Sequence, residues 1–256
     1  MTVVLTIAGL DPSGGAGIVA DVKTIAALGC FPAAAITSIT FQNTTGVFGA
    51  EHQSAATLRS QVQPIVDDLT VAAAKTGMLP TAEIVAEVAR LFAEENLPAP
   101  VVDPVVVATS GDVLIDDDAF QILKTKLIPL ARIVTPNILE AEKLTGLSIQ
   151  SETDMRRAAE AIQSLGARAV LVKGGHRKLS GDALDILLNE DGSFSEFRSE
   201  YLDVGEVHGS GCTLSAAIAA CLGKGMTLEE SVSTAKRYVT DAIRTSPRIG
   251  HGAKPL

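Results

Sequence analysis

Short apolar runs rich in β-branched residues alternate with longer segments of helical periodicity along the whole chain. The apolar runs predict strands at residues 3–9, 33–41, 71–77, 100–106, 131–137, 169–175 and 183–188. Three segments of the first half predict helices at residues 18–28, 58–67 and 83–94. In the second half, apolar stripes at i, i+3, i+4 spacing predict helices around residues 155–162 and 214–222. The order of these elements is typical of an α/β fold.

The predicted strands are nearly continuous in apolar residues, which is typical of parallel strands covered on both faces. The pattern therefore predicts a three-layer, doubly wound, mostly parallel sheet with helices on both faces. In such a fold, ligands bind outside the carboxyl ends of the strands. The sequence has no low-complexity linker and no repeat of 20 to 50 residues. We therefore expect one domain that spans residues 1–256.

The composition excludes several classes of protein. Apolar residues make up 46% and charged residues 20% of 256, and the net charge is −9. No basic run is present, so a nucleic-acid or anionic-membrane surface is not expected, although backbone amides can still hold small phosphates. The three cysteines show no CxxC spacing, which argues against a disulfide framework or a zinc site and favours the cytoplasm. Neither a signal peptide nor an apolar run of membrane-spanning length is found.

A first glycine cluster lies between the first predicted strand and helix. Gly15, Gly17 and Ala20 loosely match a dinucleotide fingerprint, but no acidic residue follows about twenty positions later to hold a ribose. A dinucleotide oxidoreductase is therefore disfavoured, and the glycines are equally well explained by turn geometry. Asp11 and Asp21 are candidates for polar contacts near this turn.

Three further positions at or near strand ends carry polar chemistry. Gln42 has an amide that can pair with an aminopyrimidine-like ring, although a glutamine at a strand end is commonly just solvated. Asn137 and Glu140 form a capping box that starts a helix, and the same spacing could aim an amide and a carboxylate at hydrated magnesium. Lys173 ends an apolar strand, where it could reach a phosphate or simply face water.

The stretch HGSGCTLSAA, residues 208–217, places a glycine turn directly before a predicted helix. Gly209 and Gly211 allow consecutive N–H groups to converge, and the helix dipole adds positive potential, so an anion could bind there. Cys212 stands at the junction, where a helix end lowers a thiol pKa. The alternative is a tight turn with a small packing residue. The P-loop, protein-kinase, HExxH and GxSxG motifs are absent.

Seven segments in order resemble the hydroxymethylpyrimidine/phosphomethylpyrimidine kinases of thiamine biosynthesis, which belong to the ribokinase-like superfamily. They are LTIAGLDPSGGAGIVADVKT, TFQNTTGV, AKTGMLPT, VVDPVVVATSGDVLI, VTPNILEAEKL, VLVKGGH and VHGSGCTLSAAIAACL. The resemblance implies a ribokinase-like fold. It also implies ATP-dependent phosphorylation of 4-amino-5-hydroxymethyl-2-methylpyrimidine and then of its monophosphate, with Mg²⁺ as cofactor and a homodimer as the assembly.

The resemblance also supplies roles for individual positions. Substrate-binding positions are Gln42, Asp21, Ala16, Met78 and Val105. Nucleotide-side positions are Lys173, Asp103, Asn137 and Glu140, of which Asn137 and Glu140 would hold the metal through water. The anion hole would be Gly209, Ser210, Gly211 and Cys212. The thiol of Cys212, with its pKa lowered by the helix end, would assist deprotonation of the acceptor hydroxyl.

Two positions depart from the family pattern. Thr109 replaces a usual lysine, which removes one charged contact to the nucleotide or a second phosphate, and Ser210 replaces a commoner threonine. A pyridoxal kinase on the same scaffold is the nearest alternative, and Gln42 argues for the pyrimidine. A binding protein that has lost catalysis is a second alternative, which Thr109 favours and intact Lys173 and Cys212 oppose. No role is predicted for the tail RIGHGAKPL.

Overall fold

The computed structural model describes residues 1–106, 114–175 and 182–256. Within these ranges a nine-stranded sheet has the order β3-β2-β1-β4-β5-β6-β7-β8-β9. Its strands are β1 (Val3–Leu10), β2 (Phe31–Asn43), β3 (Gly46–His52), β4 (Val71–Thr76), β5 (Val101–Val102), β6 (Ile133–Val134), β7 (Val170–Lys173), β8 (Asp182–Leu188) and β9 (Phe194–Glu200). The pairs from β2 through β7 are parallel, while β3, β8 and β9 run antiparallel to their neighbours. The predicted mostly parallel sheet is confirmed.

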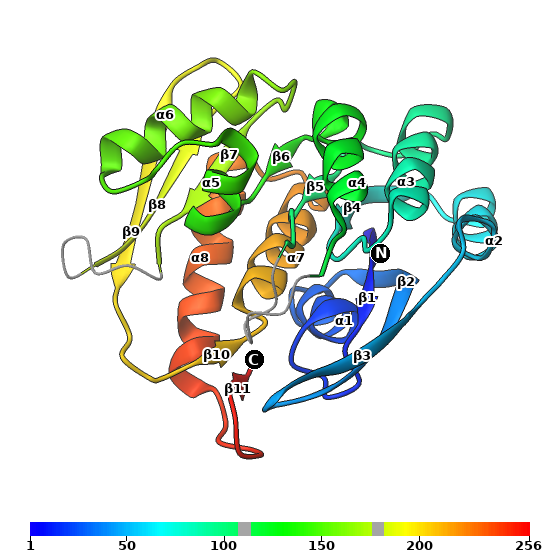
Figure 1. Ribbon diagram of the computed structural model, residues 1–256, viewed down its shortest axis with the longest axis horizontal. Coiled ribbons are helices and arrows are strands. Elements are labelled where there is room, and N and C mark those ends of the chain that lie inside the picture. Colours follow the sequence, from blue (N-terminus) through cyan, green and yellow to red (C-terminus); the bar gives the residue numbers. More distant parts are fainter. Residues whose placement is uncertain (107–113, 176–181) are drawn as a thin grey trace.

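Helices cover both faces of this sheet (Figure 1). The described helices are α1 (Gly17–Ala27), α2 (Ala55–Asp68), α3 (Ala82–Glu94), α4 (Asp117–Ile122), α5 (Ile138–Thr145), α6 (Glu152–Gln163), α7 (Ser210–Gly223) and α8 (Leu228–Thr245). After α4 the chain continues as a π-helical turn (Leu123–Leu127) and a 3₁₀ turn (Ile128–Leu130). None of the described helices is both long and apolar enough to cross a lipid bilayer.

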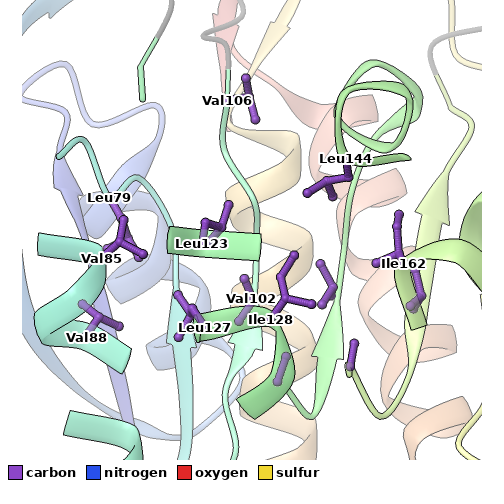
Figure 2. Packing of buried hydrophobic residues seen from close by; sticks show 14 of the residues in the cluster. Leu79, Val85, Val88, Val102, Val106, Leu123, Leu127, Ile128, Leu144 and Ile162 are labelled. Atoms are coloured by element: carbon purple, nitrogen blue, oxygen red, sulfur yellow. The ribbon is translucent and has the colours of Figure 1, made fainter. Parts of the chain in front are cut away.

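Two separate hydrophobic clusters divide these helices between the two faces. One cluster joins the sheet to α2 through α6, and Figure 2 shows Val85, Val102 and Leu127 within it. The other joins the opposite face to α1, α7 and α8 through residues such as Ile218 and Val232. Burying each such aliphatic side chain contributes about 1.5–3 kcal/mol. Each layer of helices is therefore held on its own face of the sheet by a separate hydrophobic core, which gives the predicted three layers.

The N-terminal residues of the helices distinguish those that are capped by a side chain from those that are not. Six of the described α-helices have a side-chain N-cap, supplied by Ser54, Thr81, Asp116, Asn137, Ser151 and Thr227. The N-cap positions of α1 and α7 are Ala16 and Gly209, which make no side-chain cap. Since the first amides of a helix need partners, an uncapped start at a glycine turn is suited to bind an anion.

Several elements differ from the sequence-based expectation. The predicted strand at residues 100–106 is reduced to β5, because Pro100 and Pro104 lack an N–H and Val105 N–H bonds back to the Asp103 carbonyl. The edge strands β3 and β9 were not predicted, because β3 contains two glycines and β9 three charged residues, and neither strand has a buried residue. A short parallel pair, β10 (Val207–His208) and β11 (Lys254–Pro255), was also not predicted.

Candidate active site

The predicted site residues follow strands that end at one edge of the sheet. Lys173 ends β7, Asp103 follows β5, and Asn137 follows β6. Because β5, β6 and β7 are parallel neighbours, their carboxyl ends deliver these residues to the same place. The structure therefore brings together the residues predicted for the nucleotide side.

Lys173 and Asp103 form a partly enclosed ion pair at this edge. Lys173 Nζ donates to Asp103 Oδ1 over 3.1 Å, and Ser215 Oγ of α7 donates to Asp103 Oδ2 over 3.3 Å. Burial opposes the charge on Lys173, but the carboxylates of Asp103 and Glu140 outweigh it and raise the pKa of the lysine. Lys173 is therefore a fixed cation near the start of α7, suited to a phosphate.

The predicted capping box at the start of α5 is confirmed. Asn137 Oδ1 accepts the Glu140 N–H over 2.9 Å, and Glu140 Oε2 accepts the Asn137 N–H over 2.7 Å. Burial and the nearby Asp103 charge raise the pKa of Glu140 to about 7, while Lys173 opposes that rise. The carboxyl group of Glu140 is thus close to both members of the ion pair.

This donor set fits a magnesium ion that keeps most of its water. Carboxylates of Asp103 and Glu140 lie around one lysine, and the described residues contain no group of three or more side chains that could enclose a metal. Mg²⁺ typically takes one or two carboxylates together with water and substrate phosphates. The side-chain oxygen of Asn137 is engaged in the cap, so contact of this residue with magnesium through water remains a prediction.

The turn before α7 has a geometry that only glycine permits. Gly209 has φ +89°, and a Cβ at this position would lie 1.8 Å from the carbonyl oxygen of Gly15. A Cβ on Gly211 would lie 3.2 Å from Lys173 Nζ. The turn is therefore packed between the first glycine loop and the Lys173–Asp103 pair. The backbone N–H groups that start α7 lie beside a cation, as an anion hole requires.

Cys212 lies in the first turn of α7, half-buried, where the backbone N–H of Gly17 donates to its sulfur. The expectation of a lowered thiol pKa is wrong. Burial raises the pKa of Cys212 to about 11, and Asp21 and Asp103 add to the rise, while Lys75 opposes it. Loss of solvation thus outweighs the favourable helix end.

Behind Cys212 lies a buried ion pair that sequence reasoning missed. Lys75 of β4 has no exposed surface, and its Nζ lies 3.0 and 2.8 Å from Asp21 Oδ1 and Oδ2. Thr6 Oγ1 donates to Asp21 Oδ2 over 2.6 Å. Asp21 and neighbouring charges hold the pKa of Lys75 well above its usual value despite burial. A lysine inside the apolar run VAAAKTG was the available signal.

Asp21 is consequently bonded inside the protein. Its side chain has no exposed surface, and burial raises its pKa although Lys75 and Thr6 favour the ionised form. Direct contact of Asp21 with a substrate therefore remains a prediction, and the contacts present connect it to Lys75.

A second missed pair joins the first glycine loop to the turn before α7. His208 Nε2 lies 3.0 Å from Asp11 Oδ2, and the same carboxylate accepts N–H groups of Gly15 and Ala16. Burial opposes ionisation of Asp11, but hydrogen bonds from His208 and Ser13 outweigh it and lower the Asp11 pKa. The expectation that Asp11 makes polar contacts at the first turn is confirmed.

The residues predicted for the pyrimidine side are less tightly connected. Gln42 is half-buried near the end of β2, and no hydrogen bond links its amide to the rest of the described chain. Met78 is buried against Gly9, and Ala16 adjoins Gly209, whose Cβ position lies 3.3 Å from the Ala16 Cα. Val105 is half-buried after β5. Their joint role as a substrate pocket remains a prediction.

Thr109, a departure from the family pattern, lies outside the described residues. Ser210, the other departure, is half-buried at the start of α7.

Comparison with known proteins decides the family. A sequence model described as phosphomethylpyrimidine kinase matches residues 11–256. The chain belongs to the phosphomethylpyrimidine kinase family. The resemblance found in the seven sequence segments is thereby confirmed, and with it the assignment of the chain to the kinases, which are phosphotransferases.

Relatives in this family match over nearly the full chain. A hydroxymethylpyrimidine/phosphomethylpyrimidine kinase of Streptomyces coelicolor is 46% identical over 254 residues, 99% of this chain and 93% of the relative. A phosphomethylpyrimidine kinase structure from Clostridium difficile has a TM-score of 0.84 at 42% identity, covering 95% of this chain and all of the other. An ADP complex of Bacillus subtilis pyridoxal kinase has a TM-score of 0.91 at 36% identity, covering 100% and 96%. The ribokinase-like fold is confirmed.

Proposed function

We propose that this member of the phosphomethylpyrimidine kinase family transfers the γ-phosphoryl group of ATP to 4-amino-5-hydroxymethyl-2-methylpyrimidine. A second transfer to the monophosphate would yield the diphosphate for thiamine biosynthesis. Relatives that match nearly the whole chain are named hydroxymethylpyrimidine/phosphomethylpyrimidine kinase. The observation that carries the proposal is the uncapped start of α7 beside the Lys173–Asp103 pair.

The arrangement supports a transfer in which charge is neutralised. The hydroxymethyl oxygen bonds to the γ-phosphorus, the bond from that phosphorus to the bridging oxygen breaks, and ADP leaves. Backbone N–H groups of Ser210, Gly211 and Cys212 and the Lys173 ammonium would stabilise the oxygens of the transferred group. Magnesium bound to the phosphates, with Asp103 and Glu140 nearby, would neutralise further charge.

Proton removal from the acceptor hydroxyl falls to Cys212. Because burial raises the thiol pKa to about 11, little thiolate exists at neutral pH. A loose phosphoryl-transfer transition state places little demand on early deprotonation, so a sparse base is compatible with turnover. The anion-binding turn then provides most of the catalysis.

Pyridoxal kinase activity is the second candidate. A pyridoxal kinase of Bacillus subtilis and another of Staphylococcus aureus, in complex with AMP-PCP and pyridoxal, share the fold at 36% and 31% identity. Gln42 and the higher identity to the pyrimidine kinases favour the pyrimidine as the main substrate. A binding protein without catalysis is disfavoured by the assembled Lys173, Asp103 and Gly209.

The proposal also covers the domain organisation, the oligomeric state and the cellular location of the enzyme. We infer one domain over residues 1–256 acting as a homodimer, with Phe41 and Phe48 of the β2–β3 hairpin as exposed apolar contacts, 51% and 70% accessible. All three cysteines are unpaired, which fits the reducing conditions of the cytoplasm.

A phosphorus NMR time course with ATP, magnesium and the hydroxymethylpyrimidine tests the activity. Monophosphate should appear first and diphosphate afterwards, with ADP released in step. A parallel reaction with pyridoxal should be slower. Phosphorylation of pyridoxal alone would replace the proposed substrate, and pyrimidine binding without ADP release would establish the non-catalytic alternative.

Gln42→Ala tests the pyrimidine contact. Loss of a neutral hydrogen bond to the ring should raise KM for the pyrimidine about tenfold and leave KM for ATP unchanged. Gln63→Ala is the matched control, because among the described residues the Gln63 amide bonds only to Asp67, on the surface of α2. An unchanged pyrimidine KM in Gln42→Ala would remove this residue from the substrate site.

A further inference from the structure

Residues 250–256, which we call the C-terminal strap, cross three loops that carry predicted site residues. The strap contacts the β2–β3 turn, strand β10 before α7, and the first glycine loop. Figure 1 shows this segment, in red, beside the tip of the β2–β3 hairpin and below β10. These loops are far apart in the sequence, and the strap connects all three of them.

At the hairpin, the strap is bonded to Thr44. Ala253 N–H donates to the Thr44 carbonyl over 2.8 Å, and Gly252 N–H donates to Thr44 Oγ1 over 3.3 Å. A Cβ on Gly252 would lie 1.8 Å from the Thr44 carbonyl oxygen, so the two backbones are in direct contact. Thr44 lies two positions after Gln42, the residue predicted to hold the pyrimidine.

At its other end, the strap adjoins the anion-binding turn. Lys254 N–H donates to the Glu206 carbonyl over 2.9 Å, and Pro255 pairs with His208, which directly precedes Gly209. A Cβ on Gly15 would lie 3.1 Å from Pro255 Cβ. The strap therefore reaches the residues immediately before the turn and immediately before Ala16.

A lysine of α1 secures this end. Lys23 Nζ donates to the Gly14 carbonyl over 2.8 Å and to the Leu256 carbonyl over 2.6 Å. The His208–Asp11 pair joins the same two loops from the inside. Each hydrogen bond of the strap to these loops thus lies within three positions of a predicted site residue.

We propose that the C-terminal strap is a positioning element that sets the separation between Gln42 and the anion-binding turn at Gly209. Thr44 and Gly252 are its positioning residues at the hairpin. The sheet itself does not depend on these contacts, because β2 pairs with β1 from Phe31 to Ile39, ahead of the hairpin tip that the strap contacts. Detaching the strap should therefore loosen the loops without unfolding the protein. The kinetic part of this proposal rests on the proposed pyrimidine kinase activity.

Gly252→Ala tests the strap, since its added Cβ must push the strap away from Thr44. Gly46→Ala is the matched control: it lies in the same hairpin, where a Cβ meets nothing within 4 Å. Hydrogen exchange of the full-length protein should be at least about tenfold faster at Thr44 to Gly46 and at Val207 to His208 in Gly252→Ala only. KM for the pyrimidine should rise about tenfold, with KM for ATP and the thermal midpoint nearly unchanged.

The two readouts separate the possible failures. Unchanged exchange in Gly252→Ala would overturn the proposal, because the strap would not hold the loops. Faster exchange with an unchanged pyrimidine KM would overturn the positioning role. If the wild-type protein phosphorylates no pyrimidine, the proposed function fails, and the exchange comparison by itself still supports or overturns the holding of the loops by the strap.

Discussion

The ionisation of Cys212 leads to a prediction with a definite size. Burial raises its pKa to about 11, from an ordinary value of 9.0. At pH 8 roughly one thiol in a thousand is then ionised, because each pKa unit changes the ratio tenfold. Since the thiolate is the nucleophile, the alkylation rate of Cys212 should rise about tenfold per pH unit from pH 7 to pH 10.

Iodoacetamide labelling followed by mass spectrometry of the Cys212 peptide measures this rate. Cys30 and Cys221 serve as internal references, because both are buried and burial also raises the pKa of each. Asp21→Asn removes a negative charge near the thiol, so it should lower the thiol pKa and speed labelling at fixed pH. Asp191→Asn, a change at an exposed loop, should leave the rate unchanged.

A labelling rate that levels off between pH 7 and pH 8.5 would contradict this reasoning. It would mean that the positive end of α7 and the Lys75 ammonium outweigh the loss of solvation around the sulfur. The same result would restore the expectation drawn from the sequence, with Cys212 as a base that is substantially ionised at neutral pH.

Other predictions concern the turn, the cation and the thiol. Gly209→Ala should lower the free energy of unfolding in urea by more than about 2 kcal/mol, because it adds a clash with Gly15 to the strain of a left-handed backbone. Gly205→Ala, with φ +79° and nothing within 4 Å of its Cβ, should show only the backbone strain of about 1–2 kcal/mol. Equal losses would remove the close contact from the explanation. Lys173→Met should lower kcat/KM for ATP about 10- to 100-fold, and Lys126→Met at an exposed site should not. Cys212→Ala should lower kcat and Cys212→Ser should lower it less; an unchanged kcat in the alanine variant would rule out the base role and leave the anion-binding turn as the main catalytic element.

The fold was predictable because its central strands are buried on both faces. Runs such as AVLV at residues 169–172 are apolar without interruption, and that pattern identifies a covered parallel strand. The edge strands β3 and β9 contain two glycines and three charged residues respectively and no buried position, so neither shows the continuous apolar run of a covered strand. β10 and β11 consist of two residues each, and only their mutual pairing defines them.

The candidate site was predictable as a set of motifs and less so as a set of interactions. Lys173, Asp103 and Glu140 were found because each sits in a recognisable segment, and they do lie together. The His208–Asp11 pair joins residues 197 positions apart, which no local spacing can reveal. The thiol pKa of Cys212 depends on how deeply the folded chain encloses it, and that enclosure is a property of packing rather than of helix position.

The contact between Gly209 and the Gly15 carbonyl has a consequence for biosynthesis. Strands β2 and β4 both pair with β1, and all three lie within the first 76 residues, so a nascent chain can begin its sheet while most of the protein is still to be synthesised. The turn that we propose to bind phosphate, in contrast, cannot close against Gly15 until residue 209 has left the exit tunnel. Prematurely terminated products would thus carry much of the scaffold and yet be unable to hold a nucleotide.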